Sequence, residues 1–123
     1  MSSSNRQVEC TIPVLPVRDL PRSIRFYTET LGFKLDWGGE GSIICCVSKD
    51  GCSIMLCQDA KPSAGVWVWI GVEDDSLFHL YRSRDVKVRQ EPQNHPWAYE
   101  MKFEDIDGNV LWLGTEPRKD EIK

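Results

Sequence analysis

The chain lacks the features that mark membrane proteins and nucleic-acid-binding proteins. No stretch approaches the roughly 20 apolar residues needed to span a bilayer, and residues 1–6 lack the hydrophobic region of a signal peptide. Acidic residues exceed basic ones, giving a formal net charge of -4, whereas nucleic-acid binding depends on an excess of Lys and Arg. We therefore expect a cytoplasmic protein that engages neither a membrane nor nucleic acid.

Residues suited to catalysis are also sparse. The sequence contains two histidines, His79 in a predicted helix and His95 in a predicted loop, and both are interpreted as surface or loop residues. No glycine-rich phosphate loop is present. The cysteines are odd in number and lack CxxC spacing, and we expect buried free thiols in a reducing compartment; they are Cys10, Cys45, Cys46, Cys52 and Cys57. Because no histidine is placed to activate a cysteine, the sequence predicts no catalytic residue.

The length and composition of the chain are typical of one globular domain. Its 123 residues are 41% hydrophobic and 28% charged, so a single domain over residues 1–123 can bury its own core. Polar, non-periodic stretches predict an arm at 1–7, a linker at 59–64 and a tail at 117–123. Two segments, near 9–58 and 65–115, share the order of one strand, one helix and three strands. This duplication predicts an α+β fold in which two βαβββ modules form curved mixed sheets around a cleft.

Capping residues and periodicity predict where the elements begin and end. Asp19 is a suitable N-cap for a helix whose apolar stripe runs from Leu20 to Leu31, and Gly32 fits its left-handed end. Acidic residues at 73–75 favour the start of a second helix. Alternation and turn residues predict strands at 9–17, 33–37, 43–48, 52–58, 65–72, 86–90, 97–104 and 110–115, with a loop at 91–96.

The stretch from Gly65 to Val72 divides by parity into two kinds of surface. Strand residues alternate between faces, so Trp67 and Trp69 share one face while the valines and Ile70 share the other. The aliphatic face is suited to packing under a helix. The indole face is flanked by glycines and is suited to lining a hollow, although paired tryptophans on a strand are also common as plain core residues.

Two separated motifs bracket most of the chain. One runs from Val14 to Leu20 as Val-Leu-Pro-Val-Arg-Asp-Leu, followed by Ser23, Phe26-Tyr27 and Leu31-Gly32-Phe33. The other is Phe103-Glu104-Asp105-Ile106-Asp107-Gly108-Asn109. In this order they resemble the vicinal oxygen chelate superfamily, in its glyoxalase and bleomycin-resistance branch. The resemblance implies the duplicated fold expected above, and that fold hosts both enzymes and binding proteins.

The resemblance also implies where a metal would be bound. Metal enzymes of the superfamily place their ligands on four strands, and the motifs carry those positions over to Ile12, Met55, Trp67 and Trp112. None of these side chains can ligate a hard divalent metal, which needs imidazole nitrogen or carboxylate oxygen. The resemblance therefore predicts neither a metal nor another cofactor in this chain.

Indoles at two of these positions convert a polar metal pocket into an aromatic-walled cleft. Such a cleft suits a planar aromatic small molecule, and indole faces favour a cationic one further. Metal-free members of the branch bind drugs at homodimer interfaces, so the resemblance implies a homodimer that sequesters or carries an aromatic compound or antibiotic. The expected ligand-binding residues are Trp67, Trp69, Trp112, Met55, Ile12, Trp37, Tyr99 and Trp97.

Two other interpretations stay open at this point. One is an enzyme of the same superfamily, such as a lyase, isomerase or dioxygenase, with a metal-independent or differently liganded site. The other is a structural or regulatory homodimer whose tryptophans fill the core. The second interpretation requires Trp67, Trp69 and Trp112 to be fully enclosed, with no cavity beside them.

Overall fold

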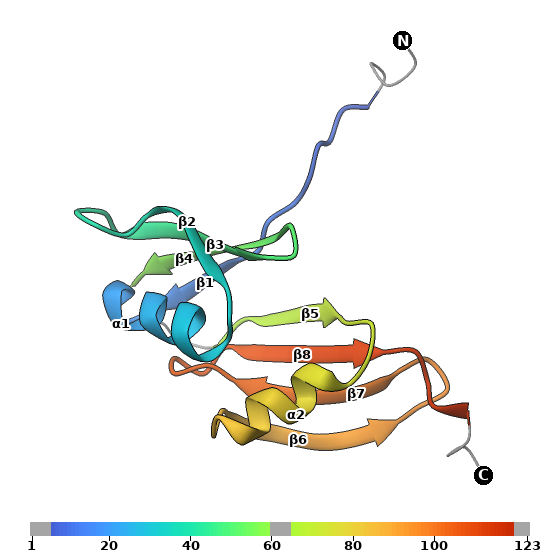
Figure 1. Cartoon of the computed structure of the whole chain (residues 1–123). Coiled ribbons are helices and arrows are strands. Elements are labelled where there is room, and N and C mark those ends of the chain that lie inside the picture. Colours follow the sequence, from blue (N-terminus) through green and yellow to red (C-terminus); the bar gives the residue numbers. More distant parts are fainter. Residues whose placement is uncertain (1–5, 60–64, 120–123) are drawn as a thin grey trace.

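Each half of the chain forms one four-stranded sheet with a main helix (Figure 1). The computed structural model describes residues 6–59 and 65–119, so the predicted linker, arm and tail lie mostly outside the described residues. Sheet A has the strand order β1-β4-β3-β2 and sheet B the order β5-β8-β7-β6. In both sheets the first strand of the module is parallel to its last strand, and the other neighbours are antiparallel. The sheets are mixed and open, and the predicted α+β fold of two βαβββ modules is confirmed.

The two modules contain the same elements in the same order. The first comprises β1 (Val14–Val17), α1 (Leu20–Arg25), β2 (Lys34–Gly38), β3 (Ile44–Lys49) and β4 (Cys52–Gln58). The second comprises β5 (Trp67–Gly71), α2 (Ser76–Ser83), β6 (Lys87–Asn94), β7 (Tyr99–Glu104) and β8 (Val110–Thr115). Among the described residues, neither helix is long and apolar enough to cross a bilayer.

Helix α1 begins where its capping residue predicts. The Asp19 carboxylate accepts a hydrogen bond from the Arg22 N–H at 3.2 Å, and Gly32 ends the segment with a φ of +84°. Between them, α1 continues into a π-helical turn, Phe26–Thr30, which the sequence pattern did not predict. Both Tyr27 and Leu31 are buried on its inner side, so the apolar stripe faces the core as expected.

Several predicted strand boundaries are wrong; β5, for example, begins at Trp67 instead of residue 65. Strand β1 begins at Val14, because ladder pairing with β4 starts there and the chain before Pro13 extends away from the sheets (Figure 1). Strand β6 runs on to Asn94 through Pro92, where a loop was expected. It is an edge strand of sheet B, where a proline need not donate to a neighbour. Strand β7 starts at Tyr99, two residues later than predicted.

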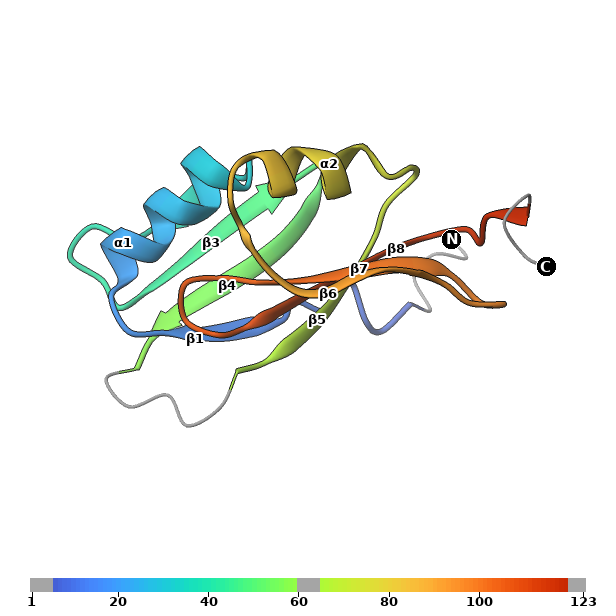
Figure 2. The ribbon, with the colours of Figure 1, turned by 90° about the horizontal axis from the view of Figure 1, so that it is seen from below.

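One core is shared by the two modules. Tyr27 and Leu31 from the first module belong to the same buried cluster as Phe78 and Tyr81 of α2. The Tyr81 hydroxyl donates to the carbonyl of Leu31 at 2.7 Å, which ties α2 to the end of the first helical segment. Both helices lie on one side of the strands (Figure 2). Each sheet therefore has an inner face toward the core and an outer face without helices.

Candidate functional site

Three tryptophans gather on the outer face of sheet B, and we call this surface the Trp face: Trp67, Trp69 and Trp112. The parallel register of β5 and β8 places Trp69 directly beside Trp112. Ring centroids lie 5.3 Å apart between Trp69 and Trp112 and 5.9 Å apart between Trp67 and Trp112, both edge to face. Such edge-to-face contacts are the favoured geometry for aromatic pairs. The predicted parity is confirmed, since Val68 and Ile70 pack on the core from the opposite face.

The tryptophans of β5 are not enclosed by this chain. Trp67 and Trp69 each keep 49% of their surface exposed, and Trp112 is half-buried. An interpretation in which all three fill a closed core does not agree with this exposure within one chain. Large exposed apolar surfaces are typical of sites that bind a ligand or a partner.

Glycines on the Trp face allow the indole of Trp69 to lie against the sheet. A methyl group at Gly114 would overlap the six-membered ring of Trp69, whereas a methyl group at Gly71 would make an ordinary 3.4 Å contact with its Nε1. Gly71 and Gly114 are opposite each other in the β5–β8 ladder. The backbone under the indole is therefore bare because position 114 has no side chain.

A polar group on the Trp face was missed by the sequence analysis. The Glu100 carboxylate is 3% exposed and accepts a hydrogen bond from Trp112 Nε1 at 2.8 Å. Lys102 Nζ lies 3.6 Å from Glu100 and donates to Gln90 Oε1 at 2.7 Å. Strict alternation along β7 was the available signal, because Glu100 and Lys102 are separated by core residue Met101 and so share the other face.

The faces of two indoles on this surface already carry cations of the protein itself. The Lys102 ammonium lies 4.7 Å from the ring centroid of Trp112 and 5.9 Å from that of Trp67. The Arg89 guanidinium lies 5.1 Å from the centroid of Trp67. These distances are within the range of cation–π attraction.

Two further predicted residues, Met55 and Trp37, lie on sheet A. Register places Val14, Met55, Cys46 and Trp37 in one row across the outer face of that sheet. Trp37 is 50% exposed and Met55 is partly buried. The structure thus gathers these predicted residues in two groups, one on the outer face of each sheet.

Three predicted residues do not join either group. Ile12 precedes β1 and is not in a strand. Tyr99 is on the inner face of sheet B, where it stacks on Phe78 at 5.4 Å. Trp97 lies before β7, is strongly exposed, and stacks on His95 with centroids 4.5 Å apart. Tyr99 lies on the same face of β7 as the core residues Met101 and Phe103, because strand residues two apart point to the same side, so strand parity assigns it to the core side.

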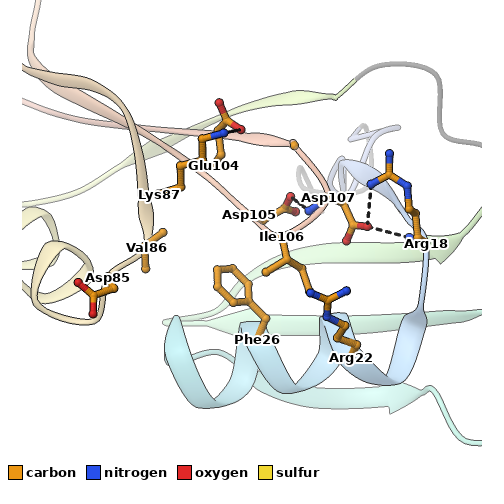
Figure 3. A pocket seen from close by; sticks show the side chains of 11 residues that line it. Arg18, Arg22, Phe26, Asp85, Val86, Lys87, Glu104, Asp105, Ile106 and Asp107 are labelled. Atoms are coloured by element: carbon orange, nitrogen blue, oxygen red, sulfur yellow. Dashed lines mark hydrogen bonds and ion pairs between the residues drawn. The ribbon is translucent and has the colours of Figure 1, made fainter.

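Two hollows lie between the modules. One, of about 750 Å³, has an apolar lining that includes Ile54, Val68 and Ile70, and Trp69 borders it. The other, of about 520 Å³, lies between α1 and the turn after β7 (Figure 3). Two ion pairs lie in its lining: Arg18 lies 3.9 Å from Asp107, and Lys87 lies 3.5 Å from Glu104.

The turn beside the second hollow is held by the buried carboxylate of Asp105. This carboxylate accepts hydrogen bonds from the Tyr27 hydroxyl at 2.7 Å and from the Asn109 backbone and side chain, each at 2.9 Å. Burial raises the pKa of Asp105, although these hydrogen bonds lower it. Burial, with the Asp105 charge adding to it, raises the pKa of Tyr27 well above its ordinary value, so this hydroxyl keeps its proton and donates.

The residues at the superfamily's metal-ligand positions do not fit a metal. Ile12 and Met55 offer no hard ligand, and the indole nitrogen of Trp112 is a donor engaged with Glu100. Among residues 6–59 and 65–119, no three His, Cys, Asp or Glu side chains are grouped to hold an ion. All five cysteines are free thiols, but the expectation that they are buried is wrong for Cys10 and Cys52, which are exposed.

The duplicated module, the open mixed sheets and the site on an outer sheet face define a glyoxalase-like α+β domain. A family model described as Glyoxalase/Bleomycin resistance protein/Dioxygenase superfamily matches residues 8–113, and the chain belongs to that superfamily. The resemblance drawn from the two sequence motifs is thereby confirmed. The superfamily contains both enzymes and non-enzymes.

Solved structures show the same fold. The chain is similar to UcmS2, with 26% identity, a TM-score of 0.74, and 89% of this chain and 98% of that chain covered. It is similar to TioX from Micromonospora sp. ML1, with 17% identity and a TM-score of 0.74; the match covers 87% of this chain and 99% of TioX. It is similar to lactoylglutathione lyase from Agrobacterium tumefaciens, with 16% identity and a TM-score of 0.71; the match covers 89% of this chain and 95% of the lyase. Comparison with curated proteins gave no match.

Proposed function

We propose that this chain is a binding protein that holds an aromatic small molecule against the Trp face without using a metal. The observation that carries the proposal is the open cluster of Trp67, Trp69 and Trp112, in which the two indoles of β5 are half-exposed and held edge to face with the third. Planar ligands gain stacking and burial on such a surface. The ligand-binding residues we assign are these three.

Loss of the metal-ligand set supports binding over metal-assisted catalysis. The positions that hold a metal in the superfamily's metal enzymes carry apolar side chains and indoles here, and an indole adds stacking area where a carboxylate or imidazole would supply charge. The proposed role is to sequester or carry an aromatic natural product or antibiotic in the cytoplasm. The free thiols agree with a reducing compartment.

We also propose that the chain acts as a homodimer. Val14, Trp37, Trp67 and Trp69 are all at least 47% exposed on the outer faces of the two sheets. Apolar surface of this extent favours a partner that covers part of it. A second copy that brings its outer face of sheet A, with Met55 and Trp37, against the Trp face would enclose a ligand between two sheets.

Removal of single indoles tests the binding site. Trp67→Ala and Trp69→Ala should each weaken binding of 2-naphthoate by about tenfold, because each removes stacking area of an aromatic contact and its burial. Leu80→Ala on the exposed side of α2 is the control and should leave affinity unchanged. Isothermal titration calorimetry with EDTA present measures the effect. Unchanged affinity in both tryptophan variants would place the ligand elsewhere, and binding that is lost with EDTA would favour a metal enzyme.

A further inference from the structure

Two hydrogen-bond donors beside the Trp face have fewer acceptors than they can use. An ammonium has three N–H donors, and Lys102 Nζ gives one to Gln90 Oε1 at 2.7 Å while Glu100 lies at 3.6 Å. Gln90 Nε2 is buried and has no hydrogen-bond partner among the described residues. Since an ammonium can only donate, its bond to Oε1 fixes the orientation of the Gln90 amide. Nε2 therefore remains a donor without an acceptor.

The charges around this pair are arranged against a cationic ligand. Lys102 and Arg89 already lie over the indoles of Trp112 and Trp67. The neighbouring carboxylates are engaged: Glu100 accepts from Trp112, and Glu104 pairs with both Lys87 and Arg89. A second cation would have to displace a protein cation from an indole face, whereas an anion would meet two cations, each already beside one carboxylate: Glu100 for Lys102 and Glu104 for Arg89.

We propose that the ligand carries an oxygen acceptor next to its aromatic ring, such as a carboxylate, phenolate or carbonyl group, and that Lys102 and Gln90 receive it. This inference rests on the proposed binding function. The indole faces alone favour a cationic ligand, whereas Lys102 and Gln90 favour a ligand with an oxygen acceptor. The Lys102 side chain is 11% exposed, so an entering ligand would contact Lys102 before it reaches the buried Nε2 of Gln90. An oxygen bound between Nζ and Nε2 would then supply the acceptor that the buried amide lacks, which removes an unfavourable state of the free protein.

A matched series of three ligands tests the sign of the charge. The probes are 2-naphthoate, 2-naphthylmethanol and 2-naphthylmethylammonium, titrated calorimetrically into the full chain at low ionic strength with EDTA. Naphthoate should bind at least about tenfold more tightly than the ammonium. The carboxylate of naphthoate gains a charge-assisted hydrogen bond from Lys102, whereas the ammonium probe is repelled by the Lys102 charge. The neutral alcohol should fall between them.

Two variants assign the preference to this pair. Lys102→Met should reduce naphthoate affinity to that of the alcohol, while Lys87→Met, an exposed lysine on the neighbouring strand, should keep the full preference. Gln90→Glu keeps an acceptor for Lys102 but replaces the Nε2 donor with a negatively charged oxygen. This variant should bind naphthoate about tenfold more weakly, or weaker still. This second variant decides the question if Lys102→Met fails to fold by circular dichroism.

The possible results separate the two proposals. Equal binding of all three probes, tighter binding of the ammonium, or an unchanged preference in Gln90→Glu would overturn the inference while the proposed function stands. Binding of none of the three probes to the unmodified chain would overturn both.

Discussion

Gly114 determines where the indole of Trp69 can lie. The ring rests over this residue, and any side chain at position 114 would overlap it. Gly114→Ala should therefore displace Trp69 and alter the near-ultraviolet circular dichroism of the tryptophans, with a cost of about 1–3 kcal/mol from overpacking. Gly71→Ala, on the same face and opposite in the ladder, places its methyl group at an ordinary distance and is the matched control. A spectrum unchanged by Gly114→Ala would show that Trp69 does not lie as described.

Asp105 should be irreplaceable by asparagine. Its carboxylate accepts four hydrogen bonds, from the Tyr27 hydroxyl, the Asp107 N–H and two groups of Asn109. The amide of asparagine has one acceptor oxygen, and its NH₂ group would face donors that bond to the carboxylate in the unmodified chain. Asp105→Asn should lower the free energy of unfolding by about 2–4 kcal/mol, measured by urea denaturation at pH 7. A loss under about 0.5 kcal/mol would contradict this arrangement.

The raised pKa of Asp105 makes a definite contribution to pH dependence. The folded state holds the proton more tightly than the unfolded state, where the ordinary value is 3.8. The contribution of Asp105 to stability is therefore greatest below that value, falls as the pH rises to the folded pKa, and stays constant above it. The stability difference between the unmodified chain and Asp105→Asn should be larger at pH 4 than at pH 7. The opposite order would mean that the pKa is lowered.

At the level of single elements, capping of α1 is open to direct measurement. The Asp19 side chain accepts the Arg22 N–H, one of the unpaired donors of the first turn. Asp19→Ala should lower the free energy of unfolding by about 1 kcal/mol, and Asp19→Ser should restore most of it. Chemical denaturation of the three proteins checks this. Equal stability of the alanine and serine variants would show that the cap does not contribute.

Local rules predicted the elements whose cause is local. Asp19 and Gly32 gave the bounds of the first helical segment, and parity within 65–72 gave the two faces of β5. Prediction failed where pairing between strands decides the outcome. The start of β1 depends on where β4 begins to pair with it, and β6 passes through Pro92 because it is a sheet edge.

The candidate site was predictable in its aromatic part and not in its polar part. Trp67 and Trp69 stand out by residue type, and the family motif brings Trp112 to them. Glu100 and Lys102 look like exposed charges in the sequence, and only the register of β7 with β8 and β6 places them beside Trp112 and Gln90. Tyr99 lies on the core side with Met101 and Phe103, which the alternation along β7 indicates and which its expected place at the rim of the cleft overlooked.

At the scale of the whole molecule, the two outer sheet faces predict self-association. Light scattering coupled to size exclusion should give twice the 14.1 kDa chain mass at micromolar concentration. Trp37→Glu would place a charge in the proposed contact and should shift the protein toward the monomer, whereas Leu80→Glu on α2 should not. A chain mass of 14.1 kDa at every concentration would contradict the dimer.

The most direct test of the binding site is a titration followed through the indole N–H signals of the five tryptophans by nuclear magnetic resonance. With 2-naphthoate and EDTA present, we predict saturable shifts of the signals of Trp67, Trp69 and Trp112 with a common dissociation constant. Ring-current effects of a stacked ligand act over a few ångströms, so these signals report contact. Saturable binding that leaves all three signals unmoved would contradict the assignment of the Trp face as the ligand site.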